Sequence, residues 1–147
     1  MKSRVSTLIH RPLDEVFRFV ANLEKLSGWQ GSTAQMTQLT PGPMQVGVQL
    51  RRIAQGPGGR FESTGEVIEY EPNRQWGYKT TSSAYDWVMR FHLEPVGDDT
   101  RLTLEVGGDA KGFFALFNLV GPLVVWATEK GLKDDLARLK NVLESQL

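Results

Sequence analysis

Apolar and polar residues alternate along most of the chain up to residue 107. This period of two is typical of half-buried strands and predicts strands at 4–9, 33–39, 46–54, 60–71, 74–82, 85–95 and 100–107. Short turn sequences separate consecutive strands, among them Gly56-Pro57-Gly58-Gly59 and Gly97-Asp98-Asp99. Consecutive strands joined by short turns pair antiparallel, so the pattern predicts an antiparallel meander. Gly47, Gly65 and Gly77 lie inside the strands and predict bends or bulges, hence a strongly bent sheet.

Two short helices are predicted between the first and second strands. Pro12 suits a first helical turn, where its missing N–H is not needed, and an apolar stripe follows it. Asn22 is a good N-cap for a second short helix over 23–28.

The C-terminal part of the chain changes to a helical spacing. The recurrence of Leu132, Leu136, Leu139 and Leu143 is one buried stripe of a helix with a period of 3.6 residues. The preceding residues 113–127 are almost all apolar, so a helix there must be covered on most sides. We expect one long helix over about 113–146 across the concave face of the sheet, with a kink at Gly121-Pro122 because proline removes a backbone donor.

Composition narrows the class of protein. The chain has 147 residues, 40% apolar and 23% charged, which suits one globular domain over 1–147. Seventeen basic residues balance seventeen acidic ones, so we expect no nucleic-acid partner. The chain has no cysteine, and its first residues lack the apolar run of a signal peptide. Both observations suit the cytoplasm, which is the compartment we expect.

Few residues suggest catalysis. A nucleophile–histidine–acid system needs a histidine, and the chain has two. His10 falls at a strand-to-helix turn, and the alternation in 85–93 puts His92 on the polar face. Clusters with metal-ligand spacing and phosphate-binding glycine loops are absent from the sequence. We therefore assign no catalytic residue, no metal site and no cofactor.

Four stretches, taken in order, resemble the START-like, or SRPBCC, superfamily and its polyketide cyclase/dehydrase and lipid transport branch. They are VSTLIHRPLDEVFRFVANLEKLSGW (5–29), GPMQVGVQLR (42–51), GEVIEYEPNRQWGYKTT (65–81) and GLKDDLARLKNVLE (131–144). The resemblance implies an α+β helix-grip fold over a single START-like domain, 1–147. In that fold a bent antiparallel sheet of six or seven strands surrounds a long C-terminal helix, with two short helices after strand 1.

The resemblance also implies a cavity between sheet and helix that takes a hydrophobic ligand, although the same large rings would suit a filled core. Alternation within the strands and the implied position of the helix select the ligand-binding candidates Arg52, Tyr78, Tyr85, Trp87, Met89, Leu104, Phe117, Val124 and Trp126. Arg52 continues the register of Val46, Val48 and Leu50, so it either points inward near the mouth or is turned outward by a bulge.

Three functions remain open at this point. The first is non-catalytic binding or transport of a small lipid-like or aromatic molecule. The second is a cyclase- or dehydratase-like enzyme acting on polycyclic substrates. The third is an interaction module that uses the apolar segment 113–126, which is large enough to suggest a homodimer or transient contact with a membrane surface.

Overall fold

The structure is a computed structural model that describes residues 2–56, 58–81, 85–110 and 121–145. Within these ranges, seven strands and three helices follow one another in the order that the sequence predicts. They are β1 (Lys2–Ile9), α1 (Leu13–Val20), the 3-10 helix η1 (Leu23–Gly28), β2 (Thr33–Gln38), β3 (Gln49–Gly56), β4 (Gly59–Glu71), β5 (Gln75–Thr81), β6 (Tyr85–Val96), β7 (Asp99–Ala110) and α2 (Gly121–Glu144).

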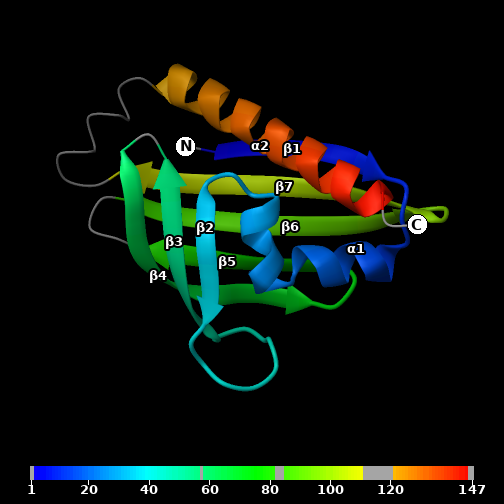
Figure 1. Cartoon of the computed structure of the whole chain (residues 1–147), viewed down its shortest axis with the longest axis horizontal. Helices are drawn as coiled ribbons and strands as arrows, with labels where there is room; N and C mark the ends of the chain where they lie inside the picture. Colours follow the sequence, from blue (N-terminus) through cyan, green and yellow to red (C-terminus); the bar gives the residue numbers. More distant parts are fainter. Residues whose placement is uncertain (1, 57, 82–84, 111–120, 146–147) are drawn as a thin grey trace.

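The strands form a single antiparallel sheet in the order β1-β7-β6-β5-β4-β3-β2. Strands β2 to β7 are a meander in which each strand pairs with the next, and β1 closes the other side by pairing with β7. The sheet turns strongly between its two edges, and β2 and β3 run across the direction of β6 and β7 in Figure 1. This confirms the antiparallel helix-grip arrangement with seven strands.

A bulge and a glycine produce part of the bend. The register between β4 and β5 shifts between Val67 and Glu69, which leaves one extra residue on β4. Gly77 lies opposite this bulge, where a Cβ would come within 2.9 Å of the Met89 carbonyl oxygen. Only glycine lets the neighbouring strands approach this closely, as its position inside the strand predicts.

The helices begin where the local sequence predicts. Pro12, in an extended conformation, directly precedes α1, whose residues Val16, Phe17 and Val20 are buried. The side chain of Asn22 accepts a hydrogen bond from the backbone N–H of Glu24 over 3.1 Å and so caps η1.

Helix α2 brings its leucine stripe into the core. Its residues Leu132, Leu136, Leu139 and Leu143 are buried with the inward-facing side chains of the sheet, and α2 packs beside β1. Gly121 is the first residue of α2, so Pro122 lies in its first turn, where proline is tolerated. The predicted helical segment 113–120 lies outside the described residues, and the predicted kink depends on it.

Strand β3 is shorter at its start than the alternation indicates. Gly47 has a φ of +95° and its N–H bonds to the Val67 carbonyl oxygen over 2.9 Å, so the chain turns there. Val46 consequently lies before the strand and is 60% exposed, whereas Val48 and Leu50 are buried as expected.

Candidate functional site

A hollow of about 380 Å³ lies between α2, β6 and the segment that follows η1, and we call it the α2 pocket. Its lining residues are Gly31, Ser32, Trp87, Ala127, Thr128, Gly131, Leu132, Asp134, Asp135 and Arg138. Pockets for small molecules commonly measure about 300–1,000 Å³, so this hollow is large enough for a compact ligand.

Behind Ser32, one wall of the α2 pocket continues into a buried polar cluster centred on Arg52. The Nη2 of Arg52 donates to the backbone oxygen of Ser32 over 3.1 Å and to its Oγ over 3.0 Å. The Nε donates to Thr33 Oγ1 over 3.0 Å, and Thr33 in turn donates to Gln30 Oε1 over 2.6 Å. The hydroxyl of Tyr78 reaches the same oxygen of Gln30 over 3.4 Å. The cluster therefore links the end of η1 to β2, β3 and β5.

The charge of Arg52 is unusual because it is buried without a counter-ion among the residues that the structure describes. The residue is only 6% exposed, and no carboxylate of the described chain lies within ion-pair distance of it. By contrast, its neighbour Arg51 points to the other face and pairs with Glu62 over 2.6 Å. A buried charge is costly unless it is paired or hydrogen-bonded, and the bonds of Arg52 to Ser32 and Thr33 offset that cost.

Burial also shifts the titration of Tyr78 and Asp135. Burial raises the pKa of the fully buried Tyr78 hydroxyl, and the opposing effects of Arg52 and Gln30 do not cancel it. The phenol is therefore a neutral hydrogen-bonding group at physiological pH. Burial likewise raises the pKa of Asp135, although the Gly31 N–H and Arg138 partly stabilise its ionised form.

Four of the residues that the sequence selects for the ligand site are buried. Tyr78 pairs with Met89 across β5 and β6, and both are buried in the core. Leu104 pairs with Phe91, whose ring stacks on Trp76 with the centroids 4.8 Å apart. Arg52 points inward, which is the first of the two orientations expected for it. The rings around Phe91 thus pack on one another, and the residue of this set that adjoins the pocket wall is Arg52.

The other candidates are spread more widely. Trp87 is half-buried and lines the α2 pocket. Trp126 is 62% exposed, carries the Nζ of Lys130 at 6.0 Å from its ring centroid, and is not among the residues that line the α2 pocket. Phe117 and the side chains of Tyr85 and Val124 lie outside the described residues.

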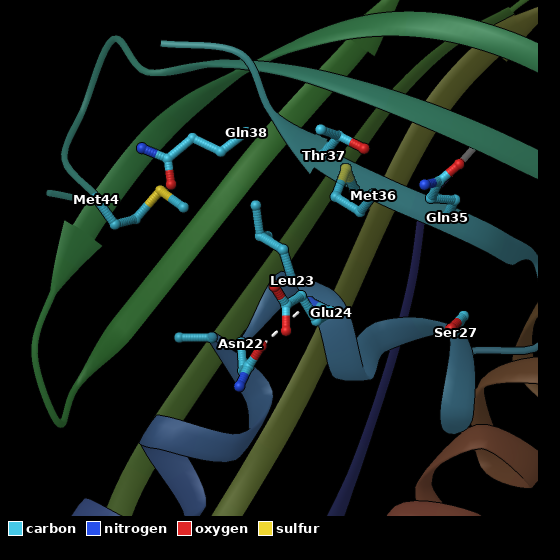
Figure 2. A pocket seen from close by; sticks show the side chains of 10 residues that line it. Asn22, Leu23, Glu24, Ser27, Gln35, Met36, Thr37, Gln38 and Met44 are labelled. Atoms are coloured by element: carbon cyan, nitrogen blue, oxygen red, sulfur yellow. Dashed lines mark hydrogen bonds between the residues drawn. The ribbon is translucent and has the colours of Figure 1, made fainter. Parts of the chain in front are cut away.

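A second hollow, of about 750 Å³, separates η1 from β2, and we call it the β2 groove. Figure 2 shows side chains from both elements turned toward the space between them. Its lining residues are Ala21, Asn22, Leu23, Glu24, Ser27, Gln35, Met36, Thr37, Gln38 and Met44. The sequence does not predict this groove, because the groove depends on the distance between η1 and the edge of the sheet.

Sequence patterns alone do not identify Gln30, Thr33 and Asp135 as parts of the site. All three are buried polar residues that look like ordinary loop, strand and helix-surface positions in the sequence. The one feature of the sequence that could have indicated the burial of Asp135 is its position beside the leucine stripe, between Leu132 and Leu136.

Within the described ranges, no group of three or more histidine and carboxylate side chains is placed to hold a metal ion. None of the described helices combines the length and apolar character needed to cross a bilayer.

Sequence comparison with known proteins identifies one matching family. The sequence profile of the family described as "Polyketide cyclase / dehydrase and lipid transport" matches residues 1–144. No curated protein matches the chain in a sequence comparison.

Solved structures with the same fold are numerous, but they are distant in sequence. A protein from Thermus thermophilus has a TM-score of 0.80 at 17% identity, with 100% of each chain covered. A START superfamily protein from Mycobacterium smegmatis has a TM-score of 0.80 at 17% identity, with 99% of each chain covered. The ZhuI aromatase/cyclase from Streptomyces sp. R1128 has a TM-score of 0.79 at 14% identity, covering 98% of this chain and 93% of that one. At these identities the likeness shows the fold alone.

Proposed function

The chain belongs to the polyketide cyclase/dehydrase and lipid transport family, whose members typically bind hydrophobic ligands, and we propose that it binds a small aromatic or lipid-like molecule in the α2 pocket. The proposed ligand places its apolar body against Trp87 and Leu132 and directs an oxygen toward Arg52. We propose that it is bound or carried without being changed, and that the protein works in the cytoplasm.

One observation carries this proposal: the guanidinium of Arg52 is buried beside the pocket wall with no carboxylate partner in the described chain. Among the described residues its hydrogen bonds go to neutral oxygens of Ser32 and Thr33, none of which carries a negative charge. An oxygen of a carboxylate, phenolate, sulfonate or polarised carbonyl would supply the missing negative charge. The lining itself is mixed: Trp87, Ala127 and Leu132 are apolar, whereas Asp134, Asp135 and Arg138 carry ionisable groups.

Occupation of the α2 pocket is tested by filling it from the helix side. The neutral fluorophore N-phenyl-1-naphthylamine is titrated against the wild type and the Thr128→Trp variant, because Thr128 is a half-buried lining residue whose enlargement occupies the hollow. The matched control is Lys133→Trp, at an exposed position of the same helix. The proposal predicts saturable binding that Thr128→Trp weakens at least about tenfold and Lys133→Trp leaves unchanged. Equal binding by all three proteins would place the probe elsewhere and contradict the proposal.

An aromatase/cyclase-like activity is a second candidate, supported by the likeness to ZhuI and by the buried pair of Arg52 and Tyr78. In such a reaction Arg52 would polarise a ketone oxygen while a neighbouring methylene carbon gives a proton to a bound water and attacks a second carbonyl, whose oxygen takes up a proton. The new alcohol would then leave as water with loss of a further carbon-bound proton, and enolisation of the remaining ketones would complete the aromatic ring. Incubation with a short aromatic-forming polyketone tests this directly. Formation of the ring at a rate that Arg52→Met lowers would favour the enzyme over the carrier.

A further inference from the structure

Strand β2 is an edge strand of the sheet. It is the last strand in the order, with β3 as its neighbour on one side. The opposite edge, β1, carries Lys2 and Arg4 and has α2 packed beside it. Proteins commonly protect free edges with charged residues or proline, and β2 (TAQMTQ) contains neither. Its bulge, between Thr33 and Gln35, disturbs the first half of the strand and leaves residues 35–38 regular.

The hydrogen-bond register shows which backbone groups face outward. The N–H of Leu39 donates to the Gln49 carbonyl oxygen over 2.8 Å, so Leu39 turns toward β3. Bonded residues alternate along an antiparallel ladder, so Thr37 and Gln35 also turn toward β3, opposite Arg51 and Ile53. The N–H and C=O groups of Met36 and Gln38 therefore point away from the sheet. These two positions are about 7 Å apart, the spacing at which an added strand forms its bonds.

Helix η1 packs beside β2, and the β2 groove opens between the two elements along the outward edge at 35–38. On the far side of the groove stands η1, with Leu23 and Glu24 turned toward the space (Figure 2). The half-buried Met44 supplies a soft apolar surface that adapts to different side chains, and Met36, 5% exposed, lines the groove from the core side. Glu24 is the one charged side chain among the described lining residues, and it is exposed. The groove thus combines a free strand edge, an apolar surface and one negative charge.

We propose that the β2 groove docks an extended peptide segment of a partner protein, which adds to the sheet as a strand beside β2. The backbone of the segment pairs with Met36 and Gln38, its apolar side chains contact Met36 and Met44, and a basic residue lies near Glu24. Strand addition to an exposed edge is a recurrent mode of peptide recognition, in which main-chain bonds give affinity and side-chain pockets give specificity. The proposal concerns a different surface from the α2 pocket and does not depend on the ligand bound there.

An extended segment suits the groove better than a compact small molecule. Among the described residues no backbone partner is seen for the outward groups of Met36 and Gln38, and their fixed interval along the strand matches that of another extended backbone. The buried Arg52 belongs to the other site and contributes no lining side chain here. A second copy of the chain, pairing β2 with β2, is an alternative occupant that the experiment distinguishes.

The test uses a capped peptide with alternating side chains, acetyl-Lys-Val-Thr-Val-Thr-Lys-amide, titrated into the isotopically labelled full chain. NMR reports the backbone amides of Met36 and Gln38, whose signals should shift and become protected from hydrogen exchange. The matched peptide, methylated on alternate backbone nitrogens, has the same side chains but cannot donate along one edge. The proposal predicts that this peptide binds at least about fivefold more weakly.

Two variants of the protein distinguish the contribution of the Gln38 backbone N–H to peptide binding from that of the Gln38 side chain. Gln38→Pro removes the outward N–H while leaving the bonds of Thr37 and Leu39 to β3, and proline is accepted on the free side of an edge strand. Gln38→Ala removes the side-chain bonds to Thr40 and Gly42 but retains the N–H. We expect Gln38→Pro to bind the peptide about fivefold more weakly than Gln38→Ala.

Three results would overturn the proposal. The first is a peptide that leaves the Met36 and Gln38 amides unchanged at millimolar concentration. The second is equal binding of the peptide and its N-methylated form, since side chains alone would then suffice. The third is a concentration-dependent dimer in sedimentation experiments that Gln38→Pro abolishes, because a second copy would then occupy the edge. Heteronuclear spectra of each variant check that it is folded before its binding is compared.

Discussion

The Nε of Arg52 donates a hydrogen bond to Thr33 Oγ1 over 3.0 Å, and both side chains are buried. The two residues are neighbours because β2 and β3 pair antiparallel, with Met36 opposite Arg52 and Thr33 opposite Ala54. Thr33 also donates to Gln30, so a single hydroxyl connects the guanidinium to the end of η1. The orientation of the proposed ligand anchor is thus set by the pairing of two adjacent strands.

Replacing Thr33 by valine should destabilise the protein by about 1–3 kcal/mol, because the buried Nε of Arg52 loses its acceptor while the shape is preserved. Urea denaturation monitored by circular dichroism measures the free energy of unfolding. Thr37→Val is the control, since Thr37 is half-buried on the same strand and should change stability by less than about 0.5 kcal/mol. Equal stability of Thr33→Val and the wild type would argue against a structural role for this bond.

Stability should depend on pH through Asp135. Burial raises the pKa of this carboxyl in the folded state, so ionisation is harder there than in the unfolded chain. Its contribution to the free energy of unfolding is fully present below the unfolded pKa, about 3.9, and falls as pH rises through the folded pKa. The free energy of unfolding of the wild type minus that of Asp135→Asn, measured by urea denaturation, should therefore be larger at pH 4 than at pH 7. The exposed neighbour Asp134→Asn is the control, and a difference that grows with pH would contradict the argument.

Gly77→Ala should cost about 1–3 kcal/mol, because its Cβ would lie 2.9 Å from the Met89 carbonyl oxygen and 3.2 Å from the side chains of Glu69 and Arg90. The control is Gly28→Ala, where a Cβ would meet no atom within 4 Å. This control should be neutral or slightly stabilising, because alanine reduces the entropy of the unfolded chain. Thermal unfolding of both variants gives the comparison, and similar melting temperatures would mean that the strands adjust easily at the bulge.

The start of α2 exposes two large apolar side chains, Leu123 at 63% and Trp126 at 62%. We propose that this surface takes part in self-association or in contact with lipid, as the apolar sequence of 113–126 suggests. Sedimentation velocity at rising concentration and flotation with neutral phosphatidylcholine vesicles measure the two processes. The double variant Leu123→Ser, Trp126→Ser should reduce whichever process the wild type shows. A wild type that stays monomeric and does not float would contradict the proposal.

Much of the fold follows from local sequence signals. The alternation of apolar and polar residues predicts the strands, and the spacing of the leucines predicts which face of α2 is buried. Asn22 predicts the start of η1, which its side chain caps. These signals depend on neighbours within a few residues, which is why they can be read without a structure. Val46 is an exception because Gly47 turns the chain through a positive φ before the strand begins, and alternation carries no information about that turn.

The candidate site was less accessible to sequence reasoning. The register of β3 pointed Arg52 inward, but its partners Thr33 and Gln30 come from other elements and were not identified. Tyr78 and Met89 were assigned to one face correctly, yet their packing against Trp76 and Phe91 depends on tertiary contacts. Distances between elements decide which buried residues border an open space, and no short pattern in the sequence encodes them.

We propose that Arg52 anchors an electron-rich group of the ligand, and two fluorescent probes that differ in one charged group measure this. 8-Anilino-1-naphthalenesulfonate and N-phenyl-1-naphthylamine share a ring system and differ in the sulfonate. Their dissociation constants are measured for the wild type, Arg52→Met and the strand neighbour Arg51→Met, after circular dichroism shows each to be folded. We predict that the wild type and Arg51→Met prefer the sulfonate by about tenfold or more, and that Arg52→Met loses this preference while still binding the neutral probe. An unchanged preference in Arg52→Met would contradict the claim.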